Sequence, residues 1–290
     1  MCKKVDYHVM KISDGIWAID EFSMVYLYVI EGSERAVVLD AGTGVSDLKS
    51  VVEGLTSKPY TVVATHGHMD HVGGIGQFDT LHIHSADVPC FSLPEESNPI
   101  GLTKRKKFCE RAIVAYGEEA LPFSVDAIQP VDMSKIKIVP YEDGTVFPLG
   151  NRSLEAIHLP AHSYGSCCML DKEDRILFAG DNFGEALLLP LGGNDRERAA
   201  WWLEGAKKVL RREDEFDMIY AGHFCPLDRE LFYDMFTLAE KIISGEIRAE
   251  IYQLDEMLGP MYHYGKAYFS MDPANLRTRD YTRIKNPRHY

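Results

Sequence analysis

The chain has 290 residues, of which 46% are hydrophobic, and a formal net charge of −13 at pH 7. This length and apolar content allow a large buried core, in one large domain or two. The acidic balance disfavours nucleic acid as the default partner, because nucleic-acid binding requires a basic surface. No apolar run approaches the ~20 residues that cross a bilayer, and charged residues interrupt any N-terminal signal core, so we expect a cytoplasmic protein without a membrane partner.

Strand-like and helix-like patterns alternate along the chain. In the first half, strands are predicted at 16–19, 25–30, 36–39, 62–65 and 80–84, with a helix over 45–55. In the second half, strands are predicted at 136–139, 154–158, 167–170, 176–179 and 218–221, with a helix that Asn194 caps and that carries apolar residues from 199 to 210. These patterns predict an α/β fold made of two related units, each a sheet followed by helices.

Two regions fall outside these units. Residues 88–130 are long and irregular, with a helix predicted near 103–117, and a stretch of this length is usually functional. Its basic run from Lys104 to Lys107 favours a solvated helix face, with a cationic rim for an anionic substrate as the alternative. From 228 a helix leads into an aromatic and basic tail, which we expect to contact a neighbouring subunit or to close over the site. We predict a catalytic domain over 1–227 and an extension over 228–290 packed on it.

The segment that follows the strand at 62–65 contains four metal-capable side chains in six positions: His66, His68, Asp70 and His71. In an extended segment, alternate residues point the same way, so the first three can converge on one side. His71 needs the chain to turn, which Gly73–Gly74 permits. Nitrogen ligands with one carboxylate suit zinc, with iron or manganese as competitors. The sequence therefore predicts a metal site.

Further metal-capable residues come later, near the ends of other predicted strands. His162 follows the strand at 154–158, Asp181 follows the apolar run 176–180, and His223 follows 218–222. Loops at the ends of buried strands are where a rigid scaffold presents functional groups. Alone, each of these residues is weak support for a site, but in this order after the first cluster they form a coherent set.

This ordered set resembles the metallo-β-lactamase-fold metallohydrolases, in the branch of glyoxalase II and the lactonases. The shared pattern is an acid after a strand (Asp40), then Thr-His-x-His-x-Asp-His, a later His, a Gly-Asp and a Gly-His. The resemblance implies a four-layer αββα sandwich, here with a helical insertion and a C-terminal extension. It also implies the ligand sets: His66, His68 and His162 for one metal; Asp70, His71 and His223 for the second; Asp181 as the bridge; and Asp40 as the acid that orients a ligand histidine.

The chemistry that the resemblance implies is hydrolysis by two divalent ions, with zinc expected first. Such ions lower the pKa of a shared water to about 7, so that hydroxide attacks a carbonyl. Asp181 would set the metal spacing, and Asp70 would also shuttle a proton to the leaving group. Tyr164, two residues after His162, is a candidate hydrogen-bond donor to the oxyanion, although a tyrosine packed on the core is equally compatible. We expect a small-molecule substrate and two divalent metal ions, Zn²⁺ first, with Fe or Mn as alternatives.

The substrate class stays open between a small ester, a thioester and a lactone, with phosphodiesters second. An iron-dependent oxidoreductase, di-iron or sulfur dioxygenase-like, is the alternative from a different class. The lactonases commonly carry a tyrosine three residues after the bridging aspartate, where this chain has Gly184. The extension shows no clear match to the glutathione-binding segment of glyoxalase II. A serine hydrolase is not supported, because no Gly-x-Ser-x-Gly elbow occurs.

Overall fold

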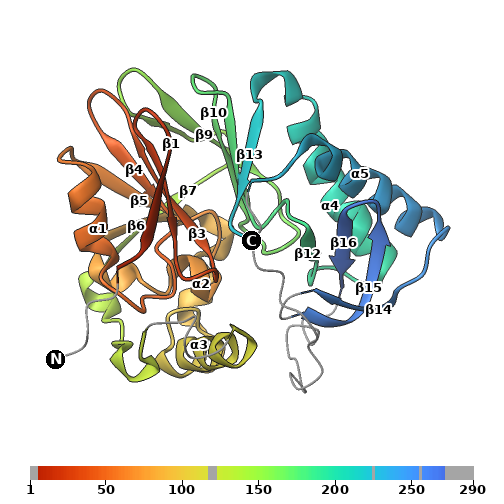
Figure 1. Cartoon of the computed structure of the whole chain (residues 1–290), viewed down its shortest axis with the longest axis horizontal. Coiled ribbons are helices and arrows are strands. Elements are labelled where there is room, and N and C mark those ends of the chain that lie inside the picture. Colours follow the sequence, from red (N-terminus) through yellow and green to blue (C-terminus); the bar gives the residue numbers. More distant parts are fainter. Residues whose placement is uncertain (1–5, 117–122, 224–225, 255–256, 272–290) are drawn as a thin grey trace.

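The computed structural model describes residues 6–271, except 117–122, 224–225 and 255–256. Its centre is two stacked β-sheets with helices outside both (Figure 1). The first sheet has seven strands in sequence order: β1 (His8–Ser13), β2 (Ile16–Asp20), β3 (Tyr26–Glu31), β4 (Ala36–Leu39), β5 (Tyr60–Val63), β6 (Thr80–His84) and β7 (Lys137–Tyr141). Strands β1 to β4 pair antiparallel, and β4 to β7 pair parallel.

The second sheet has five strands in the order β13 (Met218–Ala221), β11 (Ile176–Gly180), β10 (Cys167–Asp171), β9 (Ser153–His158) and β8 (Val146–Pro148). Helix α1 (Leu48–Leu55) packs on the outer face of the first sheet. Helices α4 (Asp195–Leu210) and α5 (Arg229–Ser244) cover the outer face of the second. The predicted four-layer αββα sandwich is therefore confirmed.

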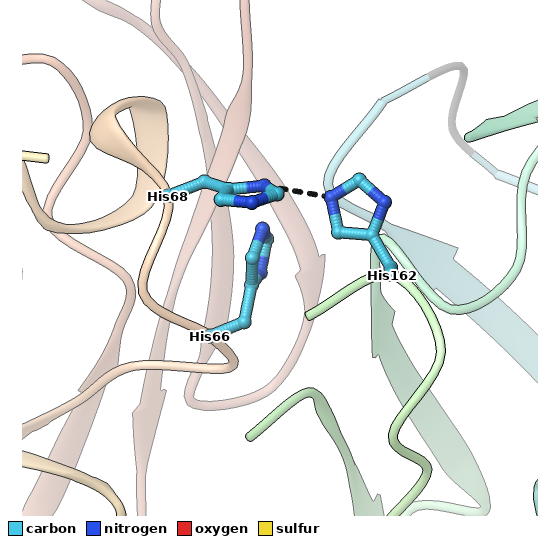
Figure 2. A group of neighbouring side chains, drawn as sticks. All are labelled: His66, His68 and His162. Atoms are coloured by element: carbon cyan, nitrogen blue, oxygen red, sulfur yellow. Dashed lines mark hydrogen bonds between the residues drawn. The ribbon is translucent and has the colours of Figure 1, made fainter. Parts of the chain in front are cut away.

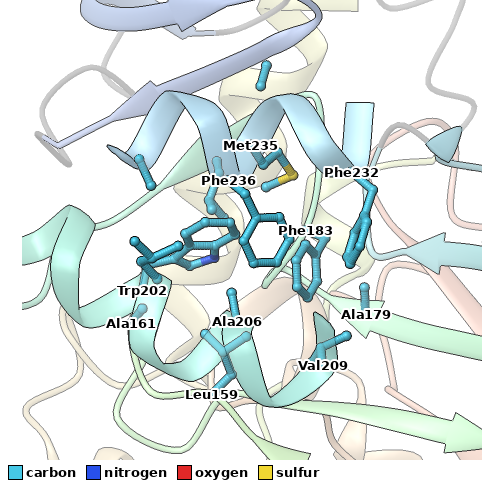
Figure 3. Packing of buried hydrophobic residues seen from close by; sticks show 14 of the residues in the cluster. Leu159, Ala161, Ala179, Phe183, Trp202, Ala206, Val209, Phe232, Met235 and Phe236 are labelled. Atoms are coloured by element: carbon cyan, nitrogen blue, oxygen red, sulfur yellow. The ribbon is translucent and has the colours of Figure 1, made fainter. Parts of the chain in front are cut away.

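Three apolar clusters hold these layers together. One lies between the sheets and includes Leu39, Val63 and Phe178. A second lies under α1, and a third, which includes Trp202, Phe183 and Phe236, lies between the second sheet and α4 and α5 (Figure 3). Cys167 belongs to the inter-sheet cluster and Cys168 to the outer one, as expected for neighbours on a strand buried on both faces.

The insertion and the extension depart from the sequence-based picture. The insertion contains a 3-10 helix (Ser85–Ser92) and α3 (Leu102–Tyr116). The extension adds β14 (Glu250–Leu254), β15 (Met257–Tyr264) and β16 (Ala267–Ser270), which form a third sheet with β12 (Ala186–Leu188). Strands β1, β8, β12 and β14–β16 were not predicted. The basic residues of the tail beyond 271 lie outside the described residues.

The expectation of a fully solvated basic face on α3 is wrong for one residue. Arg105 is only 1% exposed, and its guanidinium donates to the carbonyls of Thr43, Gly73 and Gln129. The run alternates with the helix period, so that Arg105 faces inward while Lys107 is exposed. Arg105 thereby links α3 to the loop after β4, through Thr43, and to the segment after the first cluster of metal-capable residues, through Gly73.

Candidate metal centre

The first cluster lies in a loop and a short helix after β5. Strand β5 ends at Val63, the chain bends from Thr65 to His68, and His68 is the N-cap of α2 (Met69–Val72), so Asp70 and His71 lie on one helical turn. The strand alternation that predicted convergence of His66, His68 and Asp70 therefore ends at Val63, before the first of these residues. Asp70 instead joins His71 in a second group of metal-capable residues.

Three histidines form the first group of candidate ligands: His66, His68 and His162. His162 enters from the loop after β9, so the group joins both sheets (Figure 2). One ring nitrogen from each histidine lies within 4.8 Å of those of the others, and His68 Nδ1 is 2.8 Å from His162 Nε2. Burial lowers the pKa of His66 well below its usual value, and burial with the nearby His162 lowers that of His68 to about 3. Neutral rings keep the lone pairs that a metal requires.

The second group consists of Asp70, His71, Asp181 and His223. His223 Nε2 lies 3.3 Å from oxygens of both Asp70 and Asp181. Burial opposes protonation of His223, but these two carboxylates outweigh it and raise its pKa to about 10. The residue before His223 is Gly222. A Cβ at this position would lie 2.4 Å from Asp181 Oδ1, so a side chain there would clash with the carboxylate.

Asp181 lies between the two groups. Its Oδ2 is 3.3 Å from His162 Nε2 and 3.8 Å from His66 Nε2, and its Oδ1 is 3.3 Å from His71 Nε2. One carboxylate is therefore within 4 Å of histidines from both groups. This is the geometry that a bridging ligand needs.

Asp40 orients one histidine directly and a second through Thr65. Its Oδ2 accepts from His71 Nδ1 at 2.8 Å, and both its oxygens are within 3.1 Å of Thr65 Oγ1. The hydroxyl has one proton, which it donates to the carboxylate, so it must accept from His66 Nδ1 at 3.1 Å. His162 Nδ1 donates to the Leu188 carbonyl in β12 at 2.9 Å. In His66 and His71, Nδ1 is occupied and Nε2 is left for another partner, whereas in His162 Nδ1 is occupied and Nε2 faces His68 Nδ1.

The unsatisfied atoms of the site fit metal ions. His66 Nε2, His71 Nε2 and Asp181 Oδ1 are buried and make no hydrogen bond within the described part of the chain. Buried polar groups are rarely left unpaired, and their convergence at one place calls for a shared partner. Imidazole nitrogens and carboxylate oxygens together are a donor set for zinc, iron or manganese. The residues present thus fit two divalent ions.

Sequence reasoning missed Thr65 and the Leu188 carbonyl. Thr65 belongs to the motif, but its role depends on a hydrogen-bond direction that only the structure provides, and a backbone carbonyl carries no sequence signal. Tyr164 is 58% exposed, and its ring contacts that of Trp201 at 6.3 Å between centroids. It lies in the same loop as His162, but it belongs to neither group of candidate ligands.

The chain belongs to the metallo-beta-lactamase superfamily, whose sequence profile matches residues 20–223. It is 31% identical over 260 residues to the human acyl-coenzyme A thioesterase MBLAC2, and this alignment covers 82% of this chain and 87% of that protein. It is also 19% identical over 235 residues to an atrochrysone carboxyl ACP thioesterase of Emericella nidulans, over 80% of this chain and 58% of that protein.

Solved structures of low sequence identity share the fold. An archaeal metallo-beta-lactamase superfamily protein from Sulfolobus tokodaii aligns with a TM-score of 0.52 at 20% identity, over 83% of this chain and 89% of that one. The sec-alkylsulfatase Pisa1 from Pseudomonas sp. aligns with a TM-score of 0.58 at 15% identity, over 81% of this chain and 42% of that one. Within the described residues, no helix is long and apolar enough to cross a membrane.

Proposed function

We propose that this protein is a dinuclear metal-dependent hydrolase of acyl thioesters, with Zn²⁺ as its metal. The observation that carries the proposal is the position of Asp181, whose carboxylate is within 4 Å of histidines from both ligand groups. The similarity to an acyl-coenzyme A thioesterase over 82% of the chain supports the substrate class. Small esters and lactones present the same electrophilic carbonyl and are secondary substrates.

The two ligand groups define which residues would hold each ion. His66, His68 and His162 would hold the first, Asp70, His71 and His223 the second, and Asp181 would contact both. Bound there, the ions would polarise the substrate carbonyl and lower the pKa of a water molecule. The Asp40 and Thr65 hydrogen bonds hold His71 and His66 with their Nε2 atoms toward the centre.

Asp70 has a second proposed role as a proton carrier. Its carboxylate is buried beside His223, so a proton that it takes up is screened from bulk water.

The leaving group of a thioester is a thiolate. The ordinary pKa of a thiol is about 8.5, close to neutrality, so the thiolate can leave with little protonation by an acid. This makes a thioester an easier substrate for the site than an alkyl ester.

The substrate-facing role proposed for Tyr164 has its own test. If its hydroxyl donates to the oxyanion, Tyr164→Phe lowers kcat about 10²-fold with unchanged metal content. Steady-state kinetics on an acyl thioester measure this, and Trp201→Phe is the matched control for loss of ring packing. An unchanged kcat in Tyr164→Phe would leave the tyrosine as a packing residue.

Metal content and thioester turnover test the function together. The purified protein, loaded under metal-limited conditions, is expected to contain about two zinc ions per chain by elemental analysis. It should release free thiol from acyl-coenzyme A, lose this activity with a chelator and regain it with Zn²⁺. His162→Ala should lose about one equivalent of metal. Iron with oxygen consumption would indicate an oxidoreductase instead, and phosphodiester cleavage without thioester cleavage would contradict the substrate class.

A further inference from the structure

A buried carboxylate outside both ligand groups connects the two halves of the site. Asp87 lies in the 3-10 helix that follows β6, and it is 6% exposed. Its Oδ2 accepts from the Gly67 N–H at 2.8 Å and from the Ser163 hydroxyl at 2.7 Å, and its Oδ1 accepts from the Gly165 N–H at 2.7 Å. Three donors on one carboxylate form a strong, charge-assisted set of hydrogen bonds.

The donors adjoin all three histidines of the first group. Gly67 separates His66 from His68, and Ser163 follows His162. The Gly67 loop follows β5 of the seven-stranded sheet, whereas Ser163 and Gly165 follow β9 of the five-stranded sheet. Asp87 therefore bridges the two loops that must approach each other for the three imidazoles to meet. Among the described residues, it belongs to neither group of candidate ligands.

The direction of each hydrogen bond is fixed. The carboxylate accepts, so Ser163 donates its only hydroxyl proton to Asp87. Ser166 Oγ, 2.7 Å from Ser163 Oγ, then donates to it while accepting from the Ser163 N–H at 2.9 Å. The loop after β9 is thus closed on itself and anchored to Asp87 at both Ser163 and Gly165.

The two glycines leave room for this carboxylate. A Cβ on Gly165 would lie 2.7 Å from Asp87 Cγ, closer than real Cβ contacts. A Cβ on Gly67 would lie 3.3 Å from Asp87 Oδ2 and 2.9 Å from Cys90 Sγ. Both loops therefore approach Asp87 with bare backbone, which is how a buried acid receives two amide donors from separate segments.

We propose that Asp87 is a positioning residue of the metal centre. Its carboxylate ties the His66–His68 loop to the His162 loop and so sets the spacing of the three imidazoles before a metal binds. The inference rests on the proposed function in one respect, that the three-histidine group holds a metal ion. Its structural content, the tie between the loops, exists without metal.

The test is Zn²⁺ titration of metal-free Asp87→Asn in competition with a chromophoric chelator. Asparagine keeps the size of the side chain but turns an NH₂ toward one of the donors, so at least one hydrogen bond is lost. The expected result is a loss of about 10–100-fold in affinity for one of the two binding steps. The affected step should be the one that His162→Ala removes. Ser163→Ala, which keeps both glycine amides, should cause a smaller loss in the same step.

Asp171→Asn is the matched control. Asp171 is a fully buried carboxylate at the far end of β10, where it accepts from the Asp174 N–H. Its replacement should lower the melting temperature and leave both zinc affinities unchanged. If Asp87→Asn behaves in the same way, Asp87 is only a structural acid and the proposal is wrong.

A second measurement separates this proposal from the proposed function. If the parent protein binds no zinc at the three-histidine group, the function fails, and the tie is judged by amide hydrogen exchange in the metal-free protein. Faster exchange at Gly67 and Gly165 in Asp87→Asn than in the parent would support the tie. Unchanged exchange at both amides would reject it.

Discussion

At the scale of single residues, Asp40 connects histidines of both candidate ligand groups. It adopts a left-handed backbone conformation (φ +65°), unusual for a residue other than glycine, and it contacts His71 directly and His66 through Thr65. Strained backbone persists where the surrounding structure holds it, and such positions cluster at functional sites. Here the strain brings one carboxylate to both His71 and Thr65.

Replacement of Asp40 should therefore weaken the binding of both proposed metal ions. In Asp40→Asn, an NH₂ group replaces one carboxylate oxygen and faces either the His71 Nδ1–H or the Thr65 hydroxyl. The affinity for each metal ion should therefore fall about 10–100-fold. Chelator competition measures this. Thr65→Val removes only the branch to His66 and should weaken one ion. Wild-type affinity for both ions in Asp40→Asn would show that Asp40 is no more than a strand-end cap.

Glu21 makes stability depend on pH. It is fully buried after β2, where burial raises its pKa to about 7 against hydrogen bonds from Thr43 and Tyr7. The folded state therefore prefers the protonated acid. The stabilising contribution is complete below the ordinary carboxyl pKa of about 4.5, is lost as pH rises to about 7, and amounts to about 3 kcal/mol.

Denaturant unfolding of Glu21→Gln tests this as a function of pH. The glutamine has a constant penalty for its misplaced amide, but it does not ionise. Relative to the variant, the parent should lose stability between pH 4.5 and 7.5. Glu110→Gln, an exposed position on α3, is the control. Parallel stability curves for Glu21→Gln and the parent would mean that Glu21 ionises as freely in the folded state as in the unfolded chain.

At the scale of elements, Arg105 links α3 to the loop after β4 and to the segment after α2. Arg105→Met leaves the carbonyls of Thr43, Gly73 and Gln129 without their donor. Because hydrogen bonds from a charged group contribute about 1.5–3 kcal/mol each and some carbonyls will regain water, we expect a loss of about 3 kcal/mol in unfolding free energy. Urea denaturation checks this, with Lys107→Met as the exposed control. Equal stability of both variants would mean that the Arg105 hydrogen bonds contribute no more to stability than an exposed lysine does.

Element prediction succeeded where periodicity was strong. The runs at 36–39 and 80–84 match β4 and β6, and Asn194 caps α4 through Arg196 and Glu197 amides as predicted. Strands β8 and β12 have three residues each, too few for a periodic signal. Strand β15 was missed because Gly259 and Pro260 interrupt its pattern, which local signals associate with turns.

The metal-capable residues were found from the sequence because their types and spacing are unusual. Their division into groups could not come from spacing, since it depends on where α2 begins. Asp87 and Thr65 escaped notice because an aspartate in an irregular segment and a threonine at a strand end are common. Their roles come from contacts between residues far apart in the chain, which no local pattern encodes.

At the scale of the whole molecule, the extension and the second sheet share one core. Phe269 of β16, Phe236 of α5 and Trp202 of α4 are buried together, and the Trp202 and Phe269 rings lie 5.0 Å apart. We infer that the extension does not unfold separately. Phe269→Ala should lower the stability of the whole chain by about 3–5 kcal/mol in one transition.

Coincident unfolding by far-ultraviolet circular dichroism and by tryptophan fluorescence would establish this cooperativity. Tyr264→Ala, at an exposed position of β15, is the control and should leave the midpoint close to that of the parent. A separate early transition in Phe269→Ala, with the metal centre intact, would show that 228–290 is an independent unit.

The pairing of β12 with β16 has a consequence for synthesis of the chain. Leu188, whose carbonyl holds His162, pairs with Ser270, and the parallel pair begins with Ala186 opposite Tyr268. On a ribosome, His162 emerges long before the strand that secures its support. In a nascent chain, the support that β16 gives to Leu188 can therefore form only after Ala267–Ser270 have left the exit tunnel, so we expect the orientation of His162 to be fixed later than the first sheet.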